Sequence, residues 1–295
     1  MAGRFAPSPT SDLHVGNLRT AVVSWLMARH AGLPHLIRVE DLDATRVKAA
    51  PEVAARQLAD LAALGIEPDG EVVWQSERLE RYDEALRLLP TYECFCTRRE
   101  IAEAASAPHD DGYRPYPGTC RDLTDAERDA RRGERPPALR VRAEDARVTV
   151  RDRWAGPVTG TIDDFVVRRN DGAFAYNLAV VVDDLAQGVT QVVRGDDLLT
   201  SSPRQAWLGR ALGGTEPEYA HVGLVTNHQG QRLAKRDGAV TLADLAQHGL
   251  SAHAVLSLIG DSLGLNAPGE AVDLGVLLDR FDPGRRPDRW VFSAS

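Results

Sequence analysis

The chain has 295 residues, of which 43% are hydrophobic and 26% charged, and its formal net charge is −8. This composition is typical of a globular protein with one large domain and an insertion, or with two to three small domains. No apolar run reaches the roughly 18 residues of a bilayer span, and no signal region opens the chain, so a cytoplasmic location is expected. The negative charge does not favour nucleic-acid binding, which would need a local basic patch such as residues 128–135 or 285–289.

The most informative segment lies within the first 17 residues. A short apolar run leads into two prolines and then into His14-Val-Gly-Asn17, after which an amphipathic stretch begins. This order predicts a strand, a tight turn and a helix over residues 17–31, with Asn17 as its cap and Gly32 at its end. Unpaired backbone N–H groups and the helix dipole would suit a phosphate there, and Gly16 would let a nucleotide lie against the backbone.

The next elements alternate between strand and helix. Residues 35–39 predict a short strand that ends at the acidic Glu40, and residues 51–64 predict a second helix. Alternation of this kind indicates a parallel sheet, whose ligands bind at the carboxyl ends of the strands. Both the His14 turn and Glu40 lie at such ends.

The pattern changes at Cys94, where Gly, Pro, Asp and Arg become frequent and strand-like pieces follow at 138–142 and 148–150. The sheet pattern resumes at 174–183 and 189–194, and the chain turns helical after Val240. These changes predict four regions: 1–93 and 171–240 as the two halves of the catalytic domain, 94–170 as an insertion, and 241–295 as a helical end.

The three cysteines, Cys94, Cys96 and Cys120, all lie in the insertion. Disulfides are not expected in a cytosolic chain of this size, whereas three thiolates are one ligand short of a tetrahedral zinc site. The residues alone favour His109 as the fourth ligand, because imidazole binds zinc often. The alternative is three buried thiols without a metal.

A second signal lies far downstream, in the glycine-flanked loop 230–238. Lys235 and Arg236 are adjacent cations that suit a polyphosphate, and Lys235 can act as a mobile charge against a phosphoryl group. Taken alone, such a pair is usually a solvated surface feature.

These motifs carry a family resemblance. Arg4-Phe-Ala-Pro-Ser8 with the His14 turn resembles the first signature of class I aminoacyl-tRNA synthetases, and residues 232–236 resemble the second, lysine-bearing signature. Residues 38–43, 176–184 and 193–197 resemble the glutamyl branch. The resemblance implies an α/β, Rossmann-type catalytic domain with an inserted zinc-bearing α+β subdomain and a short helical C-terminal region.

Only 59 residues follow Arg236, which is too few for the expected anticodon-reading domain. Together with the Cys-x-Cys motif, this resembles the glutamyl-queuosine tRNA(Asp) synthetase family. The resemblance implies activation of L-glutamate with ATP and Mg²⁺, and transfer of glutamate to the queuosine base in the anticodon loop of tRNA(Asp). A monomer without membrane contact is expected.

The resemblance also implies roles for individual residues. The glutamate pocket would be formed by Arg4, Phe5, Ala6, Pro7, Ser8, Glu40, Tyr176 and Arg194. Within it, the two arginines would bind carboxylates, Glu40 the ammonium group, and Tyr176 would donate a hydrogen bond. ATP binding and catalysis would fall to His14, Gly16, Asn17, Lys235 and Arg236. The zinc ligands would be Cys94, Cys96, Tyr116 and Cys120, with Tyr113 and His109 as competitors for the fourth position.

Three positions depart from the family pattern. Ser11 stands where glycine is usual, which would alter the φ preference of the turn. Arg232 and Ala234 replace a common lysine and serine, and loss of the serine hydroxyl removes a phosphate donor worth about 1 kcal/mol. The alternatives are therefore a truncated glutamyl-tRNA synthetase that charges a tRNA 3′ end, a small nucleotidyltransferase, and an inactive tRNA-binding module.

Overall fold

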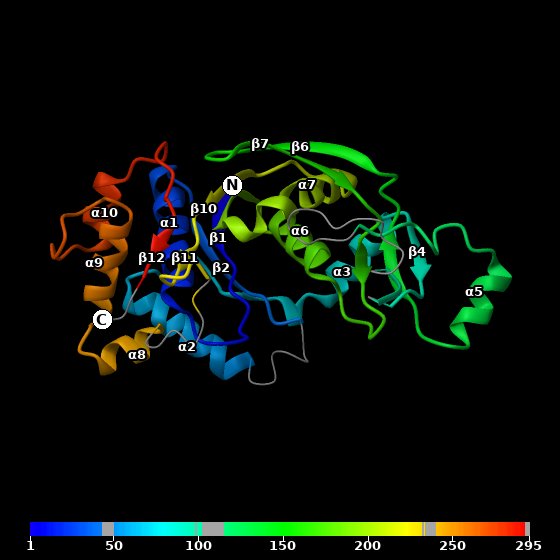
Figure 1. Ribbon diagram of the computed structural model, residues 1–295, viewed down its shortest axis with the longest axis horizontal. Helices are drawn as coiled ribbons and strands as arrows, with labels where there is room; N and C mark the ends of the chain where they lie inside the picture. The colour runs from blue at the N-terminus through cyan, green and yellow to red at the C-terminus, as the bar shows by residue number, and fades with distance from the viewer. Residues whose placement is uncertain (43–49, 98, 102–114, 232, 234–239, 293–295) are drawn as a thin grey trace.

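The computed structural model describes residues 1–42, 50–97, 99–101, 115–231, 233 and 240–292. A seven-stranded sheet lies at its centre (Figure 1), and the order of its strands is β3-β2-β1-β9-β10-β6-β7. Its strands are β1 (Ala2–Phe5), β2 (His35–Val39), β3 (Val73–Trp74), β6 (Ala146–Asp152), β7 (Gly156–Ile162), β9 (Val189–Gly195) and β10 (Glu218–Val222). Neighbouring strands pair in parallel except β6 and β7, which form an antiparallel hairpin.

The helices lie on both faces of this sheet, in the insertion and in the C-terminal region. They are α1 (Val15–His30), α2 (Ala50–Ala63), α3 (Leu79–Leu88), α5 (Asp125–Arg132), α6 (Tyr176–Ala186), α7 (Ser202–Ala211), α8 (Leu242–Gln247), α9 (Ala252–Ser262) and α10 (Leu274–Arg280), with 3₁₀ turns η1 (Gln75–Glu77) and η2 (Asp196–Ser201). Two small sheets complete the fold, one of β4 (Thr91–Cys94), β5 (Ala138–Val141) and β8 (Val166–Arg168), the other of β11 (Val225–Thr226) and β12 (Trp290–Val291). In the described parts of the chain, no helix is long and apolar enough to cross a bilayer.

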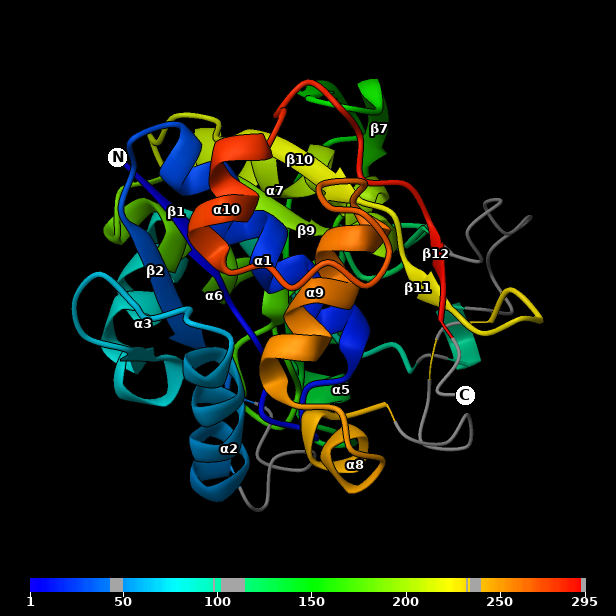
Figure 2. The ribbon, with the colours of Figure 1, turned by 90° about the vertical axis from the view of Figure 1, so that its left-hand side faces the viewer.

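The sheet is wound in two directions from its middle. From β1 the chain passes through α1 to β2 on one side, and from β9 it passes through α7 to β10 on the other. Because parallel crossovers are right-handed, the two connections place their helices on opposite faces of the sheet. Figure 2 shows α1, α9 and α10 on one face and α6 and α7 on the other. The winding reverses between β1 and β9, where open α/β sheets form their ligand crevice.

Two hydrophobic clusters hold the layers together. One joins α1 to the C-terminal helices through buried residues such as Leu18, Leu245 and Leu277. The other joins α3, α6 and α7 to the hairpin β6–β7 through residues such as Tyr82 and Leu178. The helical C-terminal region is thus packed on α1, next to the turn that precedes it.

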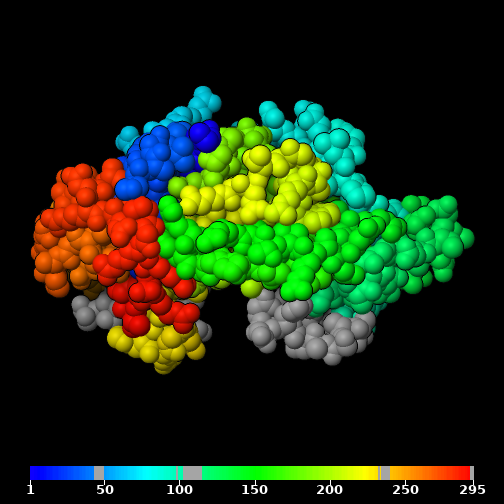
Figure 3. Space-filling view, turned by 90° about the horizontal axis from the view of Figure 1, so that it is seen from above, coloured from blue at the N-terminus to red at the C-terminus, as the bar shows by residue number. Residues whose placement is uncertain are grey.

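The insertion contributes to two parts of the fold. Its strands β5 and β8 pair with β4, whereas β6 lies beside β10 at the edge of the main sheet. In the space-filling view of Figure 3, the green residues of this hairpin form the surface between the C-terminal region and the rest of the insertion. The β6–β7 hairpin therefore joins the insertion to the main sheet. The division of the chain into regions at residues 93, 170 and 240 stays a prediction.

Two local predictions need correction. Residues 174–183 were expected to form part of the sheet, but they contain the start of α6, whose residues 178–183 are all buried. A continuous apolar run does not distinguish a buried strand from a buried helix, and α6 is covered by the sheet, α3 and α7. The first helix begins at Val15 rather than at residue 17, and its N-cap is His14 rather than Asn17. The predicted order of strand, turn and helix is confirmed.

Candidate functional site

A cavity of about 570 Å³ opens at the carboxyl ends of the strands where the winding reverses. The residues that follow β1, β2, β9 and β10 all contribute to its wall, together with the first turn of α1 and the start of α6. Of the residues that the sequence assigns to glutamate and ATP, those lining this cavity are Phe5, Ala6, Pro7, Ser8, His14, Gly16, Asn17, Glu40, Tyr176 and Arg194.

The first turn of α1 is closed by its own cap. The His14 side chain accepts hydrogen bonds through Nδ1 from the backbone N–H groups of Gly16 (3.1 Å) and Asn17 (3.4 Å), and the N–H of Val15 donates to the carbonyl of Val240 (2.8 Å). The expectation that this turn exposes unpaired N–H groups is therefore wrong. Because Nδ1 accepts, the hydrogen of the neutral imidazole resides on Nε2, which makes Nε2 the polar donor of this helix end.

The structure gives a further reason for glycine at position 16 and answers the expected effect of Ser11 on the turn, while the approach of a nucleotide to Gly16 stays a prediction. A Cβ at Gly16 would lie 3.1 Å from the His14 ring, so the missing side chain makes room for the capping imidazole. Positive φ among the described non-glycine residues occurs only at Glu144 and Asp145. Ser11 therefore adopts a conformation that any residue can take, and its replacement of glycine does not strain the turn.

Gln57 holds the loop that carries Ser11. Its Nε2 donates to the carbonyls of Ser8 (3.1 Å) and Ser11 (2.7 Å), and the side chain lies in the cavity wall. Gln57 is not among the site residues predicted from the sequence. The signal was present, because Gln57 lies between Ala54 and Leu61 on the buried face of α2, where a polar side chain needs a specific partner.

A buried charge network lies beside the cavity. Arg38 donates to Asp184 (2.7 Å) and to Glu40 (3.2 Å), and Arg4 donates to Asp184 (3.3 and 3.4 Å). Burial raises the pKa of Glu40 despite the nearby Arg38 and Arg4. Arg4 is 4% exposed and does not line the cavity, so its described partner is Asp184 rather than open space. Glu40 and Tyr176, by contrast, both face the cavity.

The helix that carries Tyr176 is anchored by Asp183. This fully buried carboxylate accepts hydrogen bonds from Gln75 (2.8 Å), Arg78 (2.6 Å) and the hydroxyl of Tyr82 (2.8 Å). These bonds hold α6 against η1, which contains Gln75, and α3, which contains Tyr82. They matter more because no side chain caps the start of α6.

Arg194, at the end of β9, is held by protein acceptors on most of its donors. Nε donates to His221 (3.0 Å), Nη1 to Gln205 (2.6 Å), and Nη2 to Ser202 (2.9 Å) and the carbonyl of Leu198 (3.2 Å). The second N–H of Nη1 has no acceptor among the described residues. Arg194 thus enters the cavity wall with a rigid orientation and little capacity to swing.

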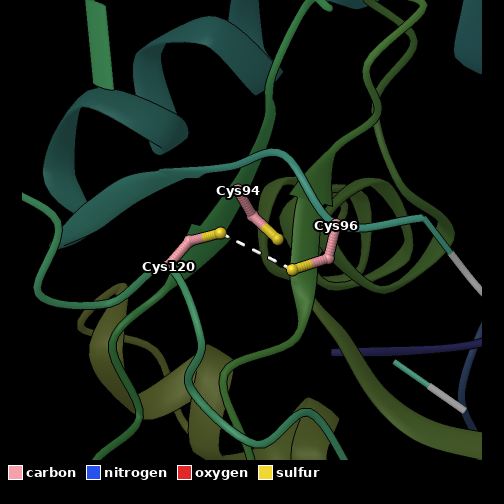
Figure 4. Close-up of side chains that lie close together, drawn as sticks. All are labelled: Cys94, Cys96 and Cys120. Carbon is pink, nitrogen blue, oxygen red and sulfur yellow. Dashed lines mark hydrogen bonds between the residues drawn. The ribbon is translucent and has the colours of Figure 1, made fainter. Parts of the chain in front are cut away.

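The three cysteines gather at the end of β4, as Figure 4 shows, with all three sulfur atoms within 4.8 Å of one another. The Sγ atoms of Cys96 and Cys120 are 3.5 Å apart, and tetrahedral zinc–sulfur bonds require a separation of about 3.8 Å. The hydroxyl of Tyr116 lies 3.4 Å from Sγ of Cys94 and 3.7 Å from Sγ of Cys96. Three sulfurs and one phenol oxygen therefore converge as a donor set that could hold a metal ion.

Tyr116 is fixed on both sides. Its hydroxyl accepts from the N–H of Cys120 (2.7 Å), and the guanidinium of Arg140 lies 3.7 Å from the centre of its ring. Its N–H donates to Asp163 (2.9 Å), which links the cluster to Arg204 of α7 (3.1 Å). The predicted competitors Tyr113 and His109 lie outside the described residues, as do Arg232, Ala234, Lys235 and Arg236.

Comparison with known proteins agrees with this architecture. The family model of class I tRNA synthetases (E and Q), catalytic domain, matches residues 1–267. The glutamyl-Q tRNA(Asp) synthetase of Nocardia farcinica is 56% identical over 99% of this chain and 93% of its own, and that of Deinococcus radiodurans is 47% identical over 89% of each.

Two solved structures share the fold. A glutamate tRNA ligase from Elizabethkingia meningosepticum, solved in complex with its amino acid, superposes with a TM-score of 0.80 at 26% identity, over 97% of this chain and 66% of its own. The glutamate-tRNA synthetase of Elizabethkingia anophelis superposes with a TM-score of 0.83 at 27% identity, over 99% of this chain and 68% of its own. This chain thus spans about two thirds of the length of these synthetases. The chain belongs to the class I tRNA synthetases (E and Q), and among them to the glutamyl-Q tRNA(Asp) synthetases.

Proposed function

We propose that this protein activates L-glutamate with ATP and transfers it to the queuosine base in the anticodon loop of tRNA(Asp). The observation that carries the proposal is the cavity at the switch point, where a carboxylate, a phenol, an arginine and a histidine-capped helix end come together from four separate segments. Its occurrence in a chain 56% identical to a glutamyl-Q tRNA(Asp) synthetase supports the choice of substrates.

In the first step, an oxygen of the glutamate α-carboxylate attacks the α-phosphorus of ATP, and the bond to pyrophosphate breaks. We assign Glu40 to the ammonium group of glutamate, Tyr176 to a hydrogen bond, and Arg194 to a carboxylate. Arg4 would support this pocket through Asp184 and its positive charge. A site with a buried arginine rejects glutamine, because an amide leaves that charge without its partner.

The phosphates would lie at the start of α1. Nε2 of His14 would donate to a phosphate oxygen, with the backbone at Gly16 and Asn17 as the floor of the site. Lys235 and Arg236 would supply positive charge as negative charge builds up in the transition state. Mg²⁺ accompanies ATP in this chemistry.

In the second step, a hydroxyl of the queuosine ring attacks the carbonyl carbon of the adenylate, AMP leaves with the bonding electrons, and the hydroxyl proton passes to a phosphate oxygen of the departing AMP. Positioning of the two reactants supplies most of the acceleration that such a step needs. The proposed zinc, held by Cys94, Cys96, Cys120 and Tyr116, would join β4 to the chain around residues 116–120 and so shape the insertion. A cytoplasmic location and a monomeric state stay predictions.

Two assays test the proposal in sequence. Glutamate-dependent exchange of pyrophosphate into ATP tests activation, and glutamine and aspartate serve as matched amino-acid controls. Exchange with another amino acid, or none with glutamate, contradicts the first step.

The acceptor is tested with labelled glutamate on tRNA(Asp) with and without queuosine. Labelling should require queuosine and should survive removal of the 3′-terminal adenosine. Loss of labelling after that trimming, or equal labelling of tRNA(Glu), would favour a glutamyl-tRNA synthetase that charges the 3′ end. Periodate oxidation does not separate these cases, because it also attacks the queuosine diol.

A further inference from the structure

Arg194 is held by a histidine that is not among the site residues predicted from the sequence. His221, on β10, is 1% exposed, and its Nε2 lies 3.0 Å from Nε of Arg194. An arginine Nε–H is always a donor, so Nε2 of His221 must be the acceptor. The imidazole therefore carries its hydrogen on Nδ1.

The other ring nitrogen meets Asp152. Nδ1 of His221 lies 2.6 Å from Oδ2 of this carboxylate, which is 1% exposed and closes strand β6. Burial lowers the pKa of His221, with Arg194 acting in the same direction and Asp152 against it. Although burial raises the pKa of Asp152, hydrogen bonds from His221 and from the backbone lower it overall. A neutral imidazole beside an ionised carboxylate follows.

The groups around the imidazole come from its own strand β10 and from four other elements. Asp152 faces it from β6, Arg194 from β9, and Asp196 acts on it from η2, while the ring of Tyr219 stacks on it at 6.3 Å. Ser202 of α7 lies 3.4 Å from Nε2, which outwardly resembles a Ser-His-Asp triad. It cannot act as one, because Ser202 is fully buried, and its Oγ and Nε2 of His221 each accept from Arg194.

We propose that Asp152 and His221 are positioning residues that hold Arg194 in its glutamate-binding orientation. Asp152 accepts a hydrogen bond from Nδ1–H of His221, which leaves Nε2 of His221 as an acceptor. Nε2 then accepts the hydrogen bond from Nε–H of Arg194 and so fixes the orientation of the Arg194 guanidinium. The inference rests on the proposed function of Arg194. Because Asp152 is the last residue of β6, the β6–β7 hairpin of the insertion would also support the catalytic pocket.

The structure makes Asp152→Asn a sharp test. Oδ1 of Asp152 accepts from the N–H groups of Trp154 (3.0 Å) and Ala155 (2.8 Å), so the asparagine oxygen will take that position. Its NH₂ group then faces Nδ1 of His221 and favours the tautomer with hydrogen on Nε2. Two donors, Nε2–H and the Nε–H of Arg194, would then face each other. In the serine-protease triad the same kind of change leaves the geometry intact and lowers kcat, because the histidine takes the wrong tautomer.

For Asp152→Asn we expect the KM for glutamate in pyrophosphate exchange to rise about 10- to 100-fold, the loss of one hydrogen bond to a charged group. The KM for ATP should stay unchanged, and kcat should change less than the KM for glutamate. Gln191→Leu is the matched control, since Gln191 is buried on the same strand as Arg194 and its Oε1 has no hydrogen-bond partner within the described parts of the chain. It should leave the KM for glutamate unchanged.

Two further measurements keep the test independent of activity and folding. Nitrogen-15 NMR of His221 should report hydrogen on Nδ1 in the wild type. If Asp152→Asn does not fold, His221→Gln, whose amide oxygen can accept from Arg194, should retain a lower KM for glutamate than His221→Leu. Absence of glutamate-dependent exchange in the wild type overturns the proposed function. Exchange with an Nε2–H tautomer, or an unchanged KM in Asp152→Asn or His221→Leu, overturns the positioning role alone.

Discussion

His14 combines two tasks that substitution can separate. As the N-cap of α1, its Nδ1 accepts from the N–H groups of Gly16 and Asn17, and as a cavity residue it has the proposed task of donating to a phosphate through Nε2. Asparagine is among the best N-cap residues, whereas alanine cannot cap. His14→Asn therefore keeps the first task and removes the second, and His14→Ala removes both.

The expected magnitudes differ accordingly. Loss of the cap in His14→Ala should reduce the free energy of unfolding by about 1 kcal/mol, while His14→Asn should stay within about 0.5 kcal/mol of the wild type. Removal of one transition-state donor lowers kcat by about 10²- to 10³-fold, so both variants should lose pyrophosphate exchange to that extent. The variants thus have equal activity and unequal stability.

Urea denaturation followed by circular dichroism gives the stability, and glutamate-dependent pyrophosphate exchange at saturating ATP gives the activity. A His14→Asn variant that retains near-normal exchange would show that the imidazole serves only as a cap. Equal destabilisation of the two variants would contradict the capping geometry.

Three further predictions concern other parts of the molecule. Lys235→Ala should greatly slow pyrophosphate exchange while glutamate binding, measured by calorimetry, changes little; near-normal exchange would contradict the assignment. Protein prepared without chelators should contain about one zinc per chain by elemental analysis, and Cys96→Ser should lose it; zinc-free wild type would leave three plain thiols. Burial and the nearby Asp12 raise the pKa of Asp60 to about 6, although Arg56 lowers it. Because the carboxyl group of Asp60 loses its proton less readily in the folded state than in the unfolded state, the free energy of unfolding falls as the pH rises from about 4 to about 6. Asp60→Asn should therefore raise the free energy of unfolding at pH 7 by about 1 kcal/mol, allowing for solvent screening, but not at pH 4, and an equal gain at both pH values would refute this explanation.

Features that depend on near neighbours in the chain could be predicted from the sequence alone. The strand, turn and helix around His14, the strands at 35–39 and 189–194, and the helical C-terminal region all follow from periodicity and from glycine and proline positions. The closeness of Cys94, Cys96 and Cys120 could also be predicted, because all three cysteines of the chain fall within residues 94–120.

Other features depend on which surfaces meet, and one sequence does not record that. Helix α6 could not be distinguished from a strand, since its burial on all sides depends on α3, α7 and the sheet. The N-cap of α1 is His14 and not the predicted Asn17, because the histidine ring fits where Gly16 has no side chain. Asp152 meets His221 across 69 residues and His221 meets Arg194 across 27, and only the parallel pairing of β6, β10 and β9 brings them into one line. Local patterns set the elements, and the order of strands in the sheet decided which side chains share the site.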